Sequence, residues 1–131
     1  MSKTMYDKVF EFREHIGLPV SREPRLLPSE QASFYARFLM EELSEFLRAH
    51  EHGDIVDAAD ALADLVYVAL GAAHHMGLPM DRIFDAVHDA NMSKSPGSTK
   101  RRGLGQDAAK PSDWVGPEGV ISLLISQEYY D

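Results

Sequence analysis

Residues 34–76 read FYARFLMEELSEFLRAHEHGDIVDAADALADLVYVALGAAHHM. Apolar residues recur here at helical spacing, which predicts two helices that are separated at Gly53. The acidic residues form two groups, Glu41, Glu42 and Glu45 in the first helix and Asp57, Asp60 and Asp64 in the second. Because a helix turns about 100° per residue, the three aspartates share one stripe roughly 60° wide. The stretch therefore predicts a helical pair that carries carboxylates where apolar side chains are normally buried.

The second helix of this pair is apolar around almost all of its circumference apart from the acidic stripe. A helix of that kind is usually buried, so we expect the stripe to point inward or into a cleft. In the first helix, Glu42 projects between the directions of Tyr35 and Phe38 and so lies inside the apolar arc. Crowded carboxylates in a low-dielectric site repel one another and lose solvation.

A hard divalent cation, which prefers oxygen ligands, would compensate this charge. The residues thus predict a metal site between two antiparallel helices, formed by Glu41, Glu42, Glu45 and Asp64. The alternative is that these are ordinary solvated acids at a helix edge. A di-iron site of the ferritin type requires a Glu-x-x-His pair on each of two helices, and the nearest match, Asp85 with His88, occurs once.

Length and composition limit the classes of protein that fit. The 131 residues correspond to one domain, and the absence of cysteine excludes disulfides and thiolate zinc sites. The net charge of −8 disfavours a general nucleic-acid binder but not a phosphorylated small molecule that is screened by metal ions. The chain shows no membrane-length apolar run and no signal region, so we expect a cytoplasmic protein, or one in the host cytoplasm if it is phage-encoded.

Helical periodicity extends to both sides of the central pair. We expect an all-α fold without strands, with main helices over residues 3–16, 29–50, 54–76 and 81–93 and a short helix after Pro117. Ser29 and Asp54 are candidate N-caps, and Gly17 and Gly77 are candidate C-terminal stops. Residues 1–93 would form the helical core, and residues 94–131 a basic arm that ends in a tail over 127–131. Since four helices cannot cover a helix that is apolar on nearly every side, we expect a dimer or a dimer of dimers.

The C-terminal part offers basic residues whose roles stay open on spacing alone. Asn91 and Lys94 could hold phosphate oxygens or could simply cap the fourth helix. The arm that continues through residues 94–110 could close over a polyphosphate or act as a solvated linker. His74 and His75 diverge by about 100° and cannot chelate together, so they receive no role.

The motif Glu41-Glu42-Leu43-Ser44-Glu45, followed by residues 61–67, ALADLVY, resembles the all-α nucleoside triphosphate pyrophosphohydrolases, the MazG-like group. Residues 91–94, NMSK, and later Lys110-Pro111 with Trp114 extend the likeness, which covers roughly residues 5 to 115. That group carries a Glu-Glu-x-x-Glu helix and then a Glu-x-x-Asp helix. This chain has Ala61 where the second motif begins, and Asp60 or Asp57 is the substitute that the sequence offers.

The resemblance implies a four-helix MazG-like module that dimerises and often forms tetramers. It would cleave a nucleoside triphosphate to the monophosphate and pyrophosphate with two or three Mg²⁺ or Mn²⁺ ions. The implied metal ligands are Glu41, Glu42, Glu45 and Asp64, with Asp60 as the substitute ligand. Glu42 and Glu45 would be catalytic and help to activate water. The implied phosphate contacts are Asn91 and Lys94, joined by Arg101, Arg102 and Lys110 of the arm.

The substrate is expected to be a deoxynucleotide such as dGTP or dUTP. The altered second motif and the basic arm make phosphoribosyl-ATP the less favoured choice. Phe12, Tyr35 and Trp114 are the candidates for stacking on the base. The alternative to an enzyme is a non-catalytic helical dimer that binds a nucleotide or a protein partner, and the missing carboxylate at Ala61 favours it.

Overall fold

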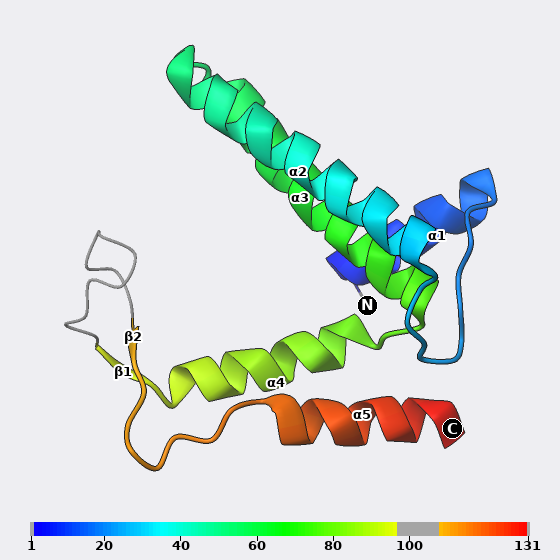
Figure 1. Ribbon diagram of the computed structural model, residues 1–131, viewed down its shortest axis with the longest axis vertical. Coiled ribbons are helices and arrows are strands. Elements are labelled where there is room, and N and C mark those ends of the chain that lie inside the picture. The colour runs from blue at the N-terminus through cyan, green and yellow to red at the C-terminus, as the bar shows by residue number, and fades with distance from the viewer. Residues whose placement is uncertain (1, 97–107, 131) are drawn as a thin grey trace. The chain divides into compact units, whose positions relative to one another are not determined.

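The computed structural model describes residues 2–96 and 108–130 (Figure 1). The described residues form α1 (Met5–Ile16), α2 (Ser29–Glu51), α3 (Ile55–Met76), α4 (Met80–Met92), β1 (Ser95–Pro96), β2 (Ala108–Ala109) and α5 (Glu118–Tyr130). The chain divides into two compact units, Met1–Met80 and Asp81–Asp131. None of the described helices is both long and apolar enough to cross a membrane.

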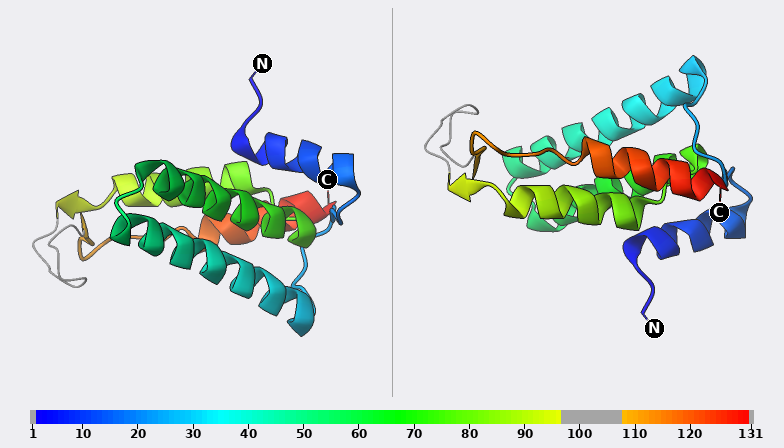
Figure 2. Two further views of the ribbon diagram at one scale, coloured as in Figure 1. Left: turned by 90° about the horizontal axis from the view of Figure 1, so that it is seen from above. Right: turned by 90° about the horizontal axis from the view of Figure 1, so that it is seen from below.

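The first unit is built on the antiparallel pair α2 and α3, which lie side by side along their length (Figures 1 and 2). Gly53, with a φ of 65°, makes the tight connection between them. The remaining helix of this unit is α1, which packs against α3. Small side chains dominate the buried positions, which include Ala49, Ala58, Ala61 and Ala73 beside Val9 and Val68. These small residues allow the helix backbones to approach closely.

Local hydrogen bonds define the helix ends as the sequence predicts at most positions. Gly17 and Gly77 adopt the left-handed conformation after α1 and α3, and Asp54 caps α3 by accepting a hydrogen bond from the Asp57 N–H. Thr4 and Asp7 form a capping box at the start of α1. The prediction of Ser29 as an N-cap is wrong, because Pro28 occupies the cap position and Ser29 is already helical. Proline suits this place since its fixed φ is compatible with the helix start.

In the second unit, α4 is followed by the two-residue antiparallel pairing of β1 with β2 and then by α5 (Figure 1). The indole Nε1–H of Trp114 donates to the carbonyl oxygen of Ala90 at 2.8 Å and so ties the segment before α5 to the end of α4. Ile83, Ala86 and Ala90 are the buried residues of α4.

The all-α prediction is confirmed, and two details of it are wrong. Two-residue strands are too short to show any periodicity, and this explains why β1 and β2 were not expected. The expected tail is helical up to Tyr130, because the apolar run through Leu123 and Leu124 carries α5 further than predicted. The predicted division at residues 93 and 94 stays a prediction, and most of the basic arm, including Arg101 and Arg102, lies outside the described residues.

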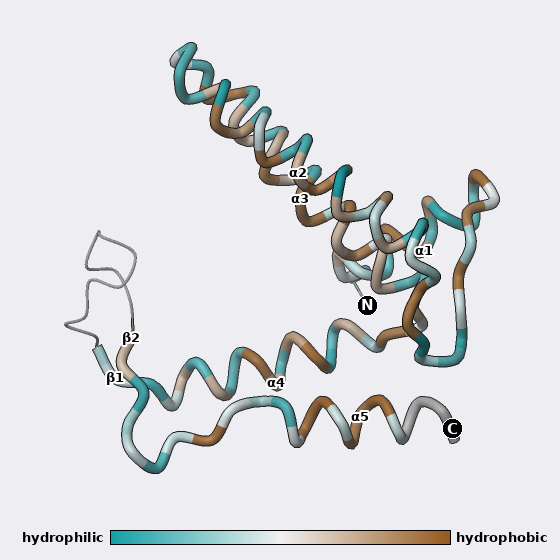
Figure 3. The backbone as a smooth tube through the Cα atoms, viewed as in Figure 1, coloured by the Kyte–Doolittle hydropathy of each residue, from teal (hydrophilic) through white to brown (hydrophobic). Residues whose placement is uncertain are grey.

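Much of the apolar surface of α3 is not covered by its own chain. Ile55 is 82% exposed, Val56 74%, Leu62 50% and Val66 44%. Figure 3 shows hydrophobic positions recurring along α3. This agrees with the expectation that the helices of one chain cannot cover α3, and the assembly that would supply the missing cover stays a prediction.

We expect Gly77→Ala to destabilise the protein more than Gly53→Ala does. Both glycines have positive φ, so an alanine costs roughly 1–2 kcal/mol of backbone strain at either site. At Gly77 a Cβ would also lie 2.5 Å from the carbonyl oxygen of Glu23, whereas at Gly53 it would meet nothing within 4 Å. Urea unfolding of the two variants measures the difference, and equal losses of stability would contradict the close packing at Gly77.

Candidate active site

A buried carboxylate lies at the seam between α2 and α3. Glu42 is only 8% exposed, as its position inside the apolar arc of α2 predicts. Its Oε2 has no hydrogen-bond partner among the described residues. A buried acceptor without a partner is costly, which marks this position as one that a ligand would complete.

The other predicted acids surround Glu42 closely enough to change its titration. Burial raises the pKa of Glu42, and the negative charges of Glu45, Asp64, Asp60 and Glu41 raise it further. The pKa of Asp64 is raised by burial and then by Asp60 and Glu45. All five residues predicted as metal ligands therefore belong to one electrostatic cluster, which we call the carboxylate cluster.

The remaining aspartate of the acidic stripe lies at the edge of this cluster. The pKa of Asp57 is raised first by its neighbour Asp54 and less by Asp60 and Glu45. Ala61 is 1% exposed, so the position where the resemblance places a glutamate belongs to the core of this chain. Asp60 is exposed and acts on the pKa values of both Glu42 and Asp64. This makes Asp60 a better placed substitute than Asp57.

The donor chemistry of the carboxylate cluster fits a hard divalent cation. All of its donors are carboxylate oxygens, they repel one another, and one buried oxygen is unpartnered. Within the described part of the chain, no three acidic or histidine side chains already converge into a formed metal-binding group. The assignment of Glu41, Glu42, Glu45, Asp60 and Asp64 as metal ligands stays a prediction.

An open hollow of about 520 Å³ lies along α2 beside the cluster. It is lined by Arg37, Met40, Glu41, Ser44, Glu45 and Arg48. The two arginines flank two of the predicted metal ligands, and the sequence reasoning did not select them. Their spacing from Glu41, four positions before and seven after, was the available signal, because it puts them on the same face of the helix.

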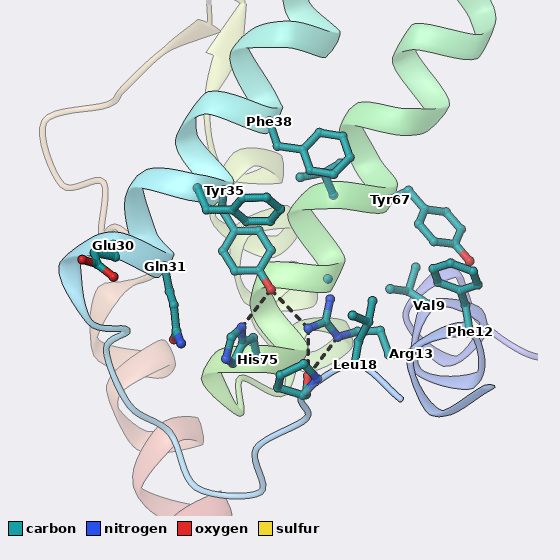
Figure 4. Close-up of a pocket in the computed structure, with 14 residues that line it drawn as sticks. Val9, Phe12, Arg13, Leu18, Glu30, Gln31, Tyr35, Phe38, Tyr67 and His75 are labelled. Atoms are coloured by element: carbon teal, nitrogen blue, oxygen red, sulfur yellow. Dashed lines mark hydrogen bonds between the residues drawn. The ribbon is translucent and has the colours of Figure 1, made fainter. Parts of the chain in front are cut away.

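A second cavity, of about 390 Å³, lies in the first unit among α1, α2 and α3 (Figure 4). We call it the aromatic cavity. It is lined by Val9, Phe12, Arg13, Leu18, Pro19, Glu30, Gln31, Phe34, Tyr35, Phe38, Tyr67, Val68, Gly71 and His75. Two of the residues predicted to bind the base, Phe12 and Tyr35, are thus brought together at one cavity. Its volume is in the range of small-molecule sites.

One wall of the aromatic cavity carries a buried hydrogen-bond network. The Arg13 guanidinium donates through Nε and Nη2 to the Pro19 carbonyl oxygen at 3.0 and 2.8 Å, and through Nη2 to the Tyr35 hydroxyl at 3.1 Å. The Tyr35 hydroxyl lies 2.8 Å from Nδ1 of His75. Burial lowers the pKa of His75, and the positive charges of Arg13 and Arg25 lower it further.

The sequence reasoning missed Arg13 and gave His75 no role. Arg13 follows Val9 by four residues and so lies on the buried face of α1, which is an unusual place for an arginine. Its place on the buried face of α1 is the feature of the sequence that could have identified Arg13. The adjacent His74 is also buried, and its ring stacks on Tyr6 with 3.8 Å between the ring centroids. The two histidines diverge as predicted, each with its own aromatic partner.

The predicted phosphate-binding residues that the structure describes belong to the second unit. Lys94 and Lys110 lie over the Trp114 ring, with their Nζ atoms 5.2 and 4.8 Å from its centroid. Asn91 is exposed. Trp114 therefore binds two lysines and, through its N–H, the end of α4, while its role in base binding stays a prediction.

A helical pair with clustered carboxylates beside an aromatic cavity is the arrangement that the resemblance to the all-α nucleotide pyrophosphohydrolases leads one to expect. Comparison with family models matches residues 9–91 to phosphoribosyl-ATP pyrophosphohydrolase. Because this match covers more than half of the chain, the protein belongs to that family, and the MazG-like resemblance is confirmed. The protein is a pyrophosphohydrolase, a hydrolase that acts on an acid anhydride bond. No curated protein matches the chain.

We expect Glu42→Gln to stabilise the metal-free protein at neutral pH. The raised pKa of Glu42 means that the folded state holds its proton at a pH where the unfolded state has lost it. Stability from this group is therefore present below about pH 4.5, the unfolded value, and is lost as the pH rises through the folded pKa.

The measurement is the free energy of unfolding in EDTA between pH 4 and 8. The wild type minus Glu42→Gln difference should fall as the pH rises, and subtraction removes the contribution of other acids. Glu51→Gln, an exposed change on the same helix, is the control and should show no such trend. A difference that rises with pH would contradict a repelled, buried carboxylate.

Proposed function

We propose that this pyrophosphohydrolase converts a nucleoside triphosphate and water to the nucleoside monophosphate and pyrophosphate, with a deoxynucleotide such as dGTP or dUTP as substrate. The observation that carries the proposal is the buried Glu42, with its unpartnered oxygen, among four further carboxylates beside an aromatic cavity. A neutral organic base suits such a cavity, and a polyanion bridged by cations suits the acids.

The carboxylate cluster would hold two or three Mg²⁺ or Mn²⁺ ions through Glu41, Glu42, Glu45, Asp60 and Asp64. When bound, the ions would screen the triphosphate, lower the pKa of water and stabilise charge on the leaving pyrophosphate. Glu42, buried at the seam among the other proposed ligands, would accept the proton that the attacking water gives up. Glu45, one turn or less away, would share that role.

In the reaction, the water oxygen forms a bond to the α-phosphorus, and the bond from that phosphorus to the bridging oxygen of pyrophosphate breaks. Arg37 and Arg48 flank the acids and would contact the phosphate oxygens. The sequence adds Asn91, Lys94, Arg101, Arg102 and Lys110 to this role, and they remain proposed phosphate contacts.

The spacing of residues along α2 and α3 supports a nucleotide that reaches from the aromatic cavity to the carboxylate cluster. Phe38 lines the aromatic cavity and precedes Glu42 by one helical turn, and Val68 lines it and follows Asp64 by one turn. A base that stacks on Phe12 and Tyr35 would therefore leave its phosphates directed toward the carboxylate cluster.

Phosphoribosyl-ATP is the second candidate substrate, because the matching family model is described by that compound. The buried Ala61 favours the other candidates, since it departs from the acidic motif that the resemblance leads one to expect. Both substrates would be cut at the same kind of bond.

We also propose that the active protein is a homodimer or a homotetramer. The exposed apolar residues of α3, including Leu62 and Val66, would be covered by a second copy of the chain. The same argument supports an assembly that contains two or more active sites.

We expect metal-dependent release of pyrophosphate from one or a few triphosphates. Purified protein is incubated with each common NTP and dNTP and with phosphoribosyl-ATP, in Mg²⁺, Mn²⁺ or EDTA, and the products are resolved by chromatography. Glu42→Gln should lower kcat at least about 100-fold, in the range of a lost acid–base group, while Glu51→Gln should retain activity. A diphosphate product, or full activity of Glu42→Gln, would refute the proposed site.

We expect Leu62→Glu to shift the protein toward the monomer, because a charge at this position would be buried against the second copy. Sedimentation velocity of the wild type and the variant measures this. Leu26→Glu is the control, since Leu26 is 85% exposed in the loop between α1 and α2. A monomeric wild type would rule out the proposed assembly.

A further inference from the structure

The aromatic cavity is lined by a buried arginine, Arg13. Arg13 is 6% exposed and makes no ion pair within residues 2–96 and 108–130. Its Nε and Nη2 donate to the Pro19 carbonyl oxygen and the Tyr35 hydroxyl, whereas no described residue accepts from Nη1. Among the described residues only Oε2 of Glu42 is a fully buried side-chain polar atom without a partner, so the N–H groups of Arg13 that lack an acceptor are open to the cavity, where a ligand could accept from them.

The direction of the hydrogen bonds in this network follows from the chemistry of arginine. A guanidinium only donates, so the Tyr35 oxygen is the acceptor from Arg13 and its own proton points elsewhere. The Tyr35 hydroxyl and Nδ1 of His75 lie 2.8 Å apart and share one hydrogen bond. We assign the Tyr35 proton to this bond, which makes His75 the neutral tautomer with its proton on Nε2, in agreement with its lowered pKa. No described residue accepts from this Nε2–H.

The guanidinium of Arg13 lies beside Gly71 of α3, which has no side chain. A Cβ at Gly71 would lie 3.0 Å from Nη1 of Arg13, so only glycine leaves this nitrogen its full space. In Figure 4 the Arg13, Tyr35 and His75 side chains meet at one wall, with Phe12 and Phe38 elsewhere around the cavity. The buried polar groups of this wall thus present N–H donors, and the aromatic rings offer stacking surfaces.

We propose that Arg13, positioned by Tyr35 and His75, selects nucleotides whose base carries a carbonyl group, not an amino group, at the position that faces Arg13, with guanine as the best fit. The proposal rests on the proposed function. Guanine presents two adjacent acceptors, O6 and N7, to such donors, whereas adenine presents an N6 amino donor next to N7. An amino group that faces Nη1 would place two hydrogen-bond donors opposite each other without an acceptor for either. This lost hydrogen bond is what would make adenine bind less well than guanine. Glu30 and Gln31 are exposed and stay solvated at the rim.

The test compares two substrates that differ in the group at position 6 of the base. Deoxyinosine triphosphate has a carbonyl group at position 6, and dATP has an amino group there. The wild type should show a kcat/KM ratio of about tenfold or more in favour of dITP and dGTP over dATP. Arg13→Gln should bring the ratio close to one, because an amide can also pair with adenine. Arg22→Gln, an exposed change outside the cavity, should keep the wild-type ratio.

A second measurement separates this proposal from the proposed function. Binding of dIMP and dAMP, followed by calorimetry, needs no turnover. A preference for dIMP without any hydrolysis would support base selection and reject the proposed reaction. Hydrolysis with equal preference for dITP and dATP would reject base selection and leave the reaction standing.

Because Arg13 is buried, its variant could fail to fold, and Tyr35→Phe provides an independent test. Loss of the hydroxyl frees His75 to present either tautomer, so discrimination between dITP and dATP should fall while the fold is retained. An unchanged ratio in folded Tyr35→Phe, or in folded Arg13→Gln, would overturn the proposal.

Discussion

The burial of one carboxylate in an otherwise apolar seam controls how the first unit is arranged. Glu42 lies where α2 packs on α3, and four acids on these two helices raise its pKa together with burial. Alanines such as Ala49, Ala58 and Ala61 provide much of the buried surface around this seam, so the backbones stay close and the acids stay crowded. A larger core would separate the helices and dilute the charge. The small alanine side chains therefore account for both the close packing of the helices and the crowding of the acids.

Much of this arrangement can be predicted from the sequence, because it is local. The helices, the caps at Asp54, Gly17 and Gly77, and the burial of Glu42 all follow from residues within a few positions of one another. The acids of the two helices come together because a short connection at Gly53 forces α2 and α3 to run antiparallel. The family match over residues 9–91 agrees with this part of the chain.

The rest could not be predicted because it depends on contacts between distant residues. Arg13 meets Tyr35 across 22 positions and Tyr35 meets His75 across 40, and no periodicity reports such pairs. Arg13 was overlooked because a sequence shows which residues are charged but not which of them become buried. The contacts of Trp114 could not be predicted either, because its lysine neighbours come from both sides of the basic arm.

The alanine at position 61 affects whether α3 needs a bound cation in order to pack. An acid at this almost fully buried position would need a cation to be present while α3 docks, since an uncompensated charge there opposes folding. With a methyl group in its place, the helical pair closes over one carboxylate, that of Glu42, instead of two, and the exposed Asp60 remains accessible afterward. With the ion binding proposed above, folding and ion uptake would be successive equilibria instead of one coupled event. A newly made chain would then reach its native shape irrespective of the supply of divalent ions, and that supply would govern only the proposed activity.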